Sequence, residues 1–125
     1  MEKKIILSAE APAPIGPYSQ AVMSGNTLYC SGQIALDTDG NMHTDSIEAE
    51  THQVMKNVGS VLKAAGMDYS NIVKTTIFIT DMNDFAKING VYASYFTADF
   101  PARETVQVSA LPKAAHVEIS VVAVK

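Results

Sequence analysis

The segment that most restricts the fold is the run 72–80, Ile-Val-Lys-Thr-Thr-Ile-Phe-Ile-Thr. It is rich in β-branched residues, which pack well on a pleated surface, so it predicts a strand. Successive side chains of a strand point to opposite faces, and here both sets contain large apolar residues. We therefore expect this strand to be covered on both sides, by helices on one and by another layer, such as a neighbouring subunit, on the other.

Five further strands are predicted around this one, at 3–8, 18–24, 27–34, 104–110 and 115–124. Gly25-Asn26 suits a tight hairpin turn, because both residue types tolerate positive φ. Apolar residues at helical spacing predict a helix over 46–65, with Asp45 as its cap, Glu48 as the capping-box partner and Gly66 as its stop. A second helix is expected from Asp81 or Asn83 to Thr97.

The order of these elements, β-β-β-α-β-α-β-β, predicts an α+β fold in which a six-stranded mixed sheet carries two helices on one face. The length of 125 residues fits a single domain, residues 1–125. Two helices cannot cover both faces of six strands. The apolar residues left on the open face therefore predict burial by self-association.

Composition argues against several classes of partner. The formal net charge is -4, and the nine basic residues are eight lysines and one arginine. Nucleic-acid binding usually needs a basic face, so we do not expect it. The single cysteine, Cys30, fits a reducing compartment and is interpreted as a small buried apolar residue. No apolar run is long enough for a signal peptide or a membrane span, so we expect a soluble cytoplasmic protein.

Two charged residues are the sharpest candidates for chemistry. Arg103, the only arginine, opens a predicted strand, and its guanidinium can bind a planar carboxylate through two parallel hydrogen bonds. A surface ion pair is the alternative. Glu118 is a lone carboxylate within an apolar strand, where burial would demand a partner or a shifted pKa. The alternative is a solvent-facing position on an edge strand.

Three weaker candidates lie elsewhere. A proline-stiffened loop presents Tyr18 to a pocket or packs it. Asn89, followed by glycine, is costly inside a helix, which packing or a ligand role would explain. Gly32 allows another group to approach the backbone closely. The histidines show no metal-ligand spacing, so no metal is expected.

The chain resembles the RidA (reactive intermediate/imine deaminase) family over most of its length. The resemblance lies in segments that occur in order between residue 9 and residue 123. They are Ala13-Pro14-Ile15-Gly16-Pro17-Tyr18-Ser19-Gln20-Ala21, Ser31-Gly32-Gln33-Ile34, Val73-Lys74-Thr75-Thr76 with Asp81-Met82, Phe85 and Asn89, Pro101-Ala102-Arg103, and Ala110-Leu111-Pro112-Lys113 with Val117-Glu118-Ile119.

The resemblance implies a chorismate-mutase-like fold and a homotrimer whose sheets form a central barrel, with clefts between neighbours. It implies hydrolytic deamination of 2-imino or enamine acids, such as 2-iminobutanoate and 2-iminopropanoate, without cofactor or metal. Arg103 would match the residue that holds the substrate carboxylate, and Glu118 the one that orients or activates water. Tyr18, Gly32 and Asn89 would match pocket positions. Thr105, also a pocket position, departs from the cysteine that many members carry.

Other functions remain open at this point. The same arginine cleft could bind 2-keto acids or amino acids without turnover, as a metabolite-sensing regulator. Ribonuclease activity, also attributed to the family, is disfavoured by the acidic charge balance. A chaperone-like role through exposed apolar surface would be independent of Arg103.

Overall fold

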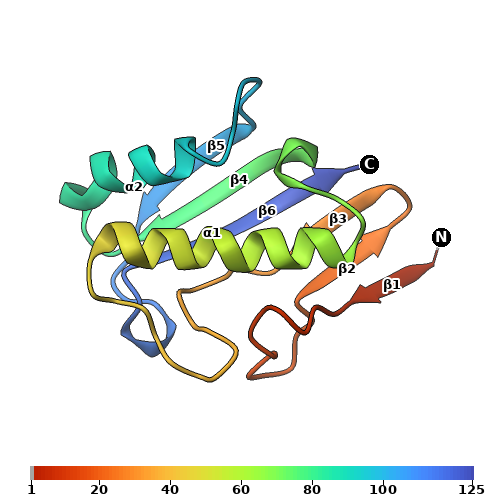
Figure 1. Ribbon diagram of the computed structural model, residues 1–125, viewed down its shortest axis with the longest axis horizontal. Helices are drawn as coiled ribbons and strands as arrows, with labels where there is room; N and C mark the ends of the chain where they lie inside the picture. The colour runs from red at the N-terminus through yellow and green to blue at the C-terminus, as the bar shows by residue number, and fades with distance from the viewer. Residues whose placement is uncertain (1) are drawn as a thin grey trace.

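The computed structural model describes residues 2–125 as one six-stranded sheet with both helices on the same face (Figure 1). The strand order is β1-β2-β3-β6-β4-β5, and of the strand pairs in the described part of the chain only β4–β5 is parallel. The predicted α+β class and the mixed sheet are therefore confirmed. The elements are β1 (Lys3–Ile6), β2 (Ala21–Ser24), β3 (Thr27–Cys30), α1 (Ile47–Ala64), β4 (Ile72–Ile79), α2 (Phe85–Ala93), β5 (Ala102–Gln107) and β6 (Val117–Val124).

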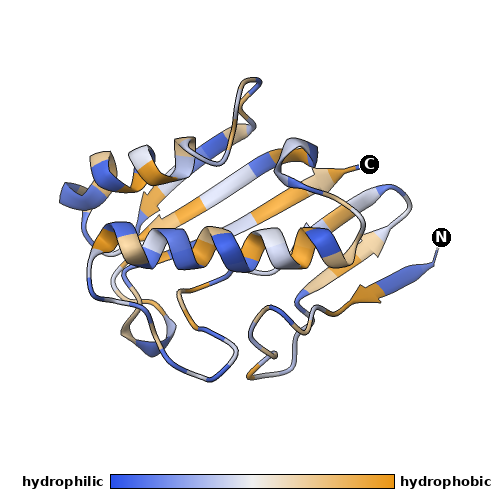
Figure 2. Ribbon diagram, in the orientation of Figure 1, coloured by the Kyte–Doolittle hydropathy of each residue, from blue (hydrophilic) through white to orange (hydrophobic). Residues whose placement is uncertain are grey.

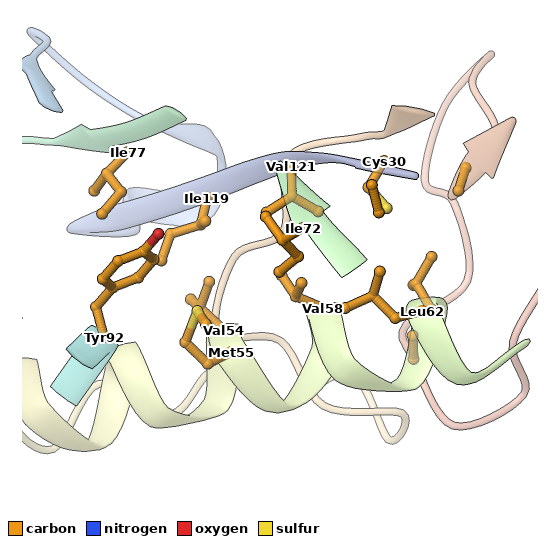
Figure 3. Packing of buried hydrophobic residues seen from close by; sticks show 14 of the residues in the cluster. Cys30, Val54, Met55, Val58, Leu62, Ile72, Ile77, Tyr92, Ile119 and Val121 are labelled. Carbon is orange, nitrogen blue, oxygen red and sulfur yellow. The ribbon is translucent and has the colours of Figure 1, made fainter. Parts of the chain in front are cut away.

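The core lies between α1 and the sheet. Figure 2 shows apolar and polar residues alternating along α1, as a helix with one buried face requires. Val58 and Leu62 point from that face toward the sheet (Figure 3), and both are fully buried. In β6, and in β4 from Thr75 onward, every second residue is buried on this side of the sheet. Burying one such aliphatic side chain stabilises the fold by about 1.5–3 kcal/mol.

Among residues 2–125, no helix lies on the other face of the sheet. Ile5, Tyr29 and Val106 are 52%, 54% and 43% exposed. Phe78 of β4 lies on this face as well, since it alternates with the buried Ile77 and Ile79. A large apolar area is therefore open in the single chain. We expected this area because two helices cannot cover both faces of a six-stranded sheet. No helix within residues 2–125 has the length and apolar character needed to cross a membrane.

Several predicted boundaries are wrong by a few residues. Ser46, not Asp45, caps α1, because the Ser46 Oγ accepts a hydrogen bond from the Ala49 N–H at 3.0 Å. The expected box between Asp45 and Glu48 is therefore not the cap. The strand predicted at 18–24 begins only at β2, and the one predicted at 104–110 is β5, two residues earlier.

The ends of the two helices show why such boundaries are hard to predict. Gly66 takes φ 73 just beyond α1, the left-handed conformation that ends a helix, so the predicted stop is confirmed. The second helix ends at Ala93, four residues before the predicted end. There the Ser94 hydroxyl donates to the Val91 carbonyl at 2.6 Å, a local bond that competes with the helix. Asn89 and Gly90 lie within α2 and do not interrupt it.

Candidate active site

Arg103 is held at the edge of the sheet beside α2. It is paired in register with Thr75 of β4, whose side chain is fully buried on the helix-covered face. The Arg103 Nη1 donates a hydrogen bond to the Asn89 Oδ1 at 2.7 Å. Its guanidinium carbon lies 5.3 Å from the centre of the Tyr92 ring and 5.7 Å from that of Phe85. Both rings attract the cation and fix its orientation.

A cleft of about 440 Å³ opens beside this guanidinium. Its lining residues are Asn89, Tyr92, Ala93, Phe100, Pro101 and Arg103. The Tyr92 hydroxyl donates to the Thr75 Oγ1 at 2.9 Å, and burial raises the pKa of Tyr92, which keeps this ring neutral. Asn89 occupies one of the five N–H donors of Arg103, so the others can bind a planar anion.

Thr105 lies on the same strand face as Arg103, two residues further along β5. Its Oγ1 is buried and has no hydrogen-bond partner within residues 2–125. The residues that line the Arg103 cleft do not include it. The predicted pocket position is therefore near the arginine but outside the lining of the cleft.

Glu118 lies in a second cleft, of about 420 Å³, on the open face of the sheet. The lining residues are Ile15, Tyr18, Ser31, Gly32, Ile34, Pro112 and Glu118. None of the ion pairs within residues 2–125 involves Glu118. Burial raises the pKa of this carboxyl above its ordinary value. A carboxylate in such surroundings is a better proton acceptor than one in water.

Gly32 is required by the position of Glu118. A Cβ atom at Gly32 would lie 2.6 Å from the Glu118 Oε2 and 2.8 Å from its Cδ, well inside van der Waals contact. The carboxylate therefore rests directly on the backbone of residue 32. This close approach is the reason for glycine that the sequence indicated.

The loop that carries Tyr18 is fastened by a buried glutamine. Gln20 is 1% exposed, and its Oε1 accepts from the Ser8 N–H at 2.6 Å. Its Nε2 donates to the carbonyls of Ser8 and Pro12, at 3.1 and 3.0 Å. The Ser31 hydroxyl donates to the Ser19 carbonyl at 2.6 Å. These bonds hold the half-exposed Tyr18 ring at the rim of the Glu118 cleft.

Within one chain the predicted residues form two groups. Arg103, Asn89 and Thr105 lie by the helix-covered face, and Tyr18, Gly32 and Glu118 by the open face. Paired residues of neighbouring strands lie on the same face of a sheet. Arg103 pairs with Thr75, which is buried on the helix-covered face, and Glu118 pairs with Phe78, which lies on the open face. A single chain does not bring Arg103 and Glu118 together.

Sequence reasoning missed part of this arrangement. Tyr92, whose ring lies under the Arg103 guanidinium, was not among the candidate residues. Glu50, a carboxylate that is 1% exposed, was not among them either. The spacing of Phe85, Asn89 and Tyr92 along one helix face was a signal that could have linked them. Within residues 2–125, no three His, Cys, Asp or Glu side chains are grouped to hold a metal ion.

The six-stranded mixed sheet with both helices on one face places this chain among the small α+β proteins. The chain belongs to the family described as Endoribonuclease L-PSP, whose sequence model matches residues 8–125. A human relative named 2-iminobutanoate/2-iminopropanoate deaminase is 47% identical over 124 residues, which cover 98% of this chain and 90% of that protein.

Solved structures have the same fold. A Yersinia pestis protein of unknown function, YyfA of the conserved Rid family, is 50% identical with a TM-score of 0.96, and the match covers 99% of this chain and 100% of that one. Escherichia coli TdcF with bound serine is 40% identical with a TM-score of 0.94, covering 98% of each chain. The resemblance to the RidA family is thereby confirmed.

Proposed function

We propose that this protein hydrolyses reactive 2-imino acids, including 2-iminobutanoate and 2-iminopropanoate, to 2-keto acids and ammonia. The observation that carries the proposal is the guanidinium of Arg103, held between Asn89 and two aromatic rings at the edge of an open cleft. Such a group suits the carboxylate that every 2-imino acid carries. The deaminase name of the human relative supports this choice of substrate.

The arginine cleft accounts for binding. Asn89 and the rings of Tyr92 and Phe85 hold the guanidinium in place before the substrate arrives, so little order is lost when the carboxylate docks. The TdcF structure contains serine, a molecule with a carboxylate next to a nitrogen-bearing carbon. A 2-imino acid has the same two groups in the same relation.

The Glu118 cleft accounts for the chemistry. Glu118 accepts a proton from water as the water oxygen bonds to the imine carbon, and it then passes this proton to the imine nitrogen, which gives the carbinolamine. Glu118 next accepts the hydroxyl proton of the carbinolamine and passes it to the nitrogen, so that the C=O bond forms as the C–N bond breaks and ammonia leaves. The products are a 2-keto acid and ammonia, and the carboxylate of Glu118 is regenerated.

Both clefts can act on one substrate only if two chains combine them. We propose a homotrimer in which the open sheet faces pack together and the Arg103 cleft of one chain meets the Glu118 cleft of the next. The exposed apolar side chains of Ile5, Tyr29 and Val106 support this packing, because such a face is costly to leave in water. A closed ring of identical chains buries the same surface on every subunit.

The family description refers to RNA cleavage, an activity that the charge of this chain does not favour. The net charge is -4, and the chain has a single arginine. Phosphate contacts along a strand of RNA need several cations on one face. RNA cleavage that survived the Arg103→Ala substitution would come from another site or from a contaminant.

A coupled assay tests the activity. A pyridoxal-phosphate threonine dehydratase generates the imine, and release of 2-ketobutyrate is followed with wild type, Arg103→Ala or no added protein. Acceleration by wild type alone is the expected result. If the wild-type protein binds 2-ketobutyrate but does not accelerate its release, the chain is a binding protein and the proposed activity is wrong.

Mixed assemblies test the shared site. Arg103→Ala and Glu118→Ala trimers should each be nearly inactive. When the two are unfolded together and reassembled at equal amounts, three quarters of the trimers are mixed and each holds one intact cleft of three, so activity should return to roughly a quarter of wild type. No recovery in mixed trimers, verified by native mass spectrometry, would place both residues in one chain's site.

We further propose that the protein works in the cytoplasm, on the support of its single thiol. Cys30 is buried, and burial raises its pKa to about 12, so the thiol is suited to a permanently reduced state. Detection in the cytoplasmic fraction of the source cells tests this.

A further inference from the structure

Glu50 is a buried carboxylate that the proposed chemistry does not use. It lies in the first turn of α1 and is 1% exposed. Its Oε2 accepts from the backbone N–H of His116 at 2.6 Å and from that of Val117 at 3.3 Å. Its Oε1 lies 2.8 Å from the His116 Nδ1. A carboxylate is rarely buried unless donors of this number compensate its charge.

These bonds hold the start of β6, directly before Glu118. β3 pairs with the far end of β6, and the last bridge on that side joins Gln33 to Ile119. The Val117 N–H lies beyond this bridge, and Glu50 provides the acceptor that a strand would otherwise supply. On the other side β4 pairs with Val117 and Glu118. The backbone before Glu118 is thus fixed between β4 and α1.

The segment that precedes this point is strained. Lys113 and Ala114 take φ 55 and 54, in the left-handed region that residues with a Cβ rarely adopt. Pro112, just before them, lines the Glu118 cleft. Two successive residues of this kind persist only when the surrounding structure holds the chain on either side. The Glu50 bonds to residues 116 and 117 provide that hold.

We propose that Glu50 is a positioning residue, which acts through the backbone of residues 116–117 to place Glu118 and Pro112 in their cleft. This inference rests on the proposed function, in which Glu118 activates water. His116 is the second part of the anchor, because its imidazole occupies the Oε1 of Glu50 and leaves Oε2 to the backbone. The anchor joins the first turn of α1 to the catalytic strand.

The proposal predicts which kinetic constant changes. Arg103, which binds the carboxylate, is held by Asn89, Tyr92 and Phe85, whereas the side-chain bonds of Glu50 go to His116 and Val117. Loss of the anchor should therefore lower kcat and leave KM and the affinity for 2-ketobutyrate within about twofold. A displacement of the reacting group by a fraction of an ångström lowers kcat by roughly five- to fiftyfold.

The test compares Glu50→Gln with Glu48→Gln, which removes an exposed carboxylate from the same turn of the helix. His116→Gln removes only the imidazole partner of Glu50, and it replaces Glu50→Gln in the comparison with Glu48→Gln if Glu50→Gln does not fold. In a Gly32→Ala background, where Glu118 is already displaced, Glu50→Gln should cost less than it does in wild type. An equal loss in both backgrounds, or a rise in KM that matches the fall in kcat, would overturn the positioning role.

Amide hydrogen exchange separates this proposal from the proposed function. Exchange at residues 116–118 should become faster in Glu50→Gln than in Glu48→Gln, whether or not the wild type deaminates imines. An inactive wild type would sink the proposed function alone. Unchanged exchange at these amides would show that Glu50 does not hold the strand, and the inference would fail.

Discussion

Gly32→Ala separates the function of the Glu118 cleft from the stability of the fold. The added Cβ would lie 2.6 Å from the Glu118 Oε2, and ordinary contact begins at 3.4 Å, so the carboxylate must retreat by about 0.8 Å (3.4 minus 2.6). The backbone of residue 32 is outside the left-handed region, so alanine fits it without strain. The clashing atoms belong to the end of a flexible side chain, which can move at a cost of about 1 kcal/mol.

The expected result is a protein that unfolds within about 1 kcal/mol of wild type but has a kcat lower by up to about a hundredfold, because misplacement of a reacting group by 1 Å costs about that much. Gly90→Ala is the matched control, since a Cβ there meets nothing within 4 Å. It should stabilise α2 by about 1 kcal/mol and keep full activity. Urea unfolding and the coupled imine assay measure both quantities. Wild-type kcat in a folded Gly32→Ala protein would refute the placement of Glu118 at the reacting carbon.

Four further outcomes are expected. Arg103→Lys should lower kcat/KM by roughly ten- to a hundredfold, because a lysine cannot bind both Asn89 and a carboxylate through a planar fork. A near-wild-type kcat/KM in steady-state kinetics would contradict the role of Arg103 in binding the carboxylate. Burial raises the pKa of Glu118 above its ordinary value of 4.5, so its stabilising contribution is present below pH 4.5 and is lost as the pH rises through the raised pKa. Glu118→Gln should therefore be more stable than wild type at pH 7 but not at pH 4, and the acid limb of the wild-type kcat profile should lie above pH 4.5. Since burial raises the pKa of Cys30 to about 12, Ellman's reagent should label the native protein far more slowly than the unfolded one. Thr105→Val should unfold at equal or higher urea concentration than wild type, because the Thr105 Oγ1 is buried and has no hydrogen-bond partner among residues 2–125. A loss of more than about 1 kcal/mol would mean that this hydroxyl is bonded in the assembly.

Much of the fold could be predicted because its signals are local. The β-branched run at 72–80 is β4, and the apolar spacing over 46–65 is α1, since each period reports directly which side chains share a face. Cap positions were less predictable. Asp45 and Ser46 are both good helix caps, and the choice of Ser46 depends on the backbone angles with which the preceding loop enters the helix.

The candidate site was predictable by residue type but not by arrangement. Arg103 and Glu118 stand out in the sequence as the only arginine and as a lone carboxylate in an apolar strand. Their separation onto opposite faces is set by the register of β5 and β6 against β4, and a shift of one residue would exchange the faces. That register depends on contacts between segments far apart in the chain.

The sequence by itself determined the order of the elements, the two helical faces that pack on the sheet and the residue types able to bind a carboxylate and activate water. Only the tertiary structure decided that Asn89 contacts Arg103 and that Glu50 is buried against the start of β6. The physical reason is that periodicity is a property of neighbours along the chain. Hydrogen-bond partners such as Glu50 and His116, 66 residues apart, are set by how the finished layers pack.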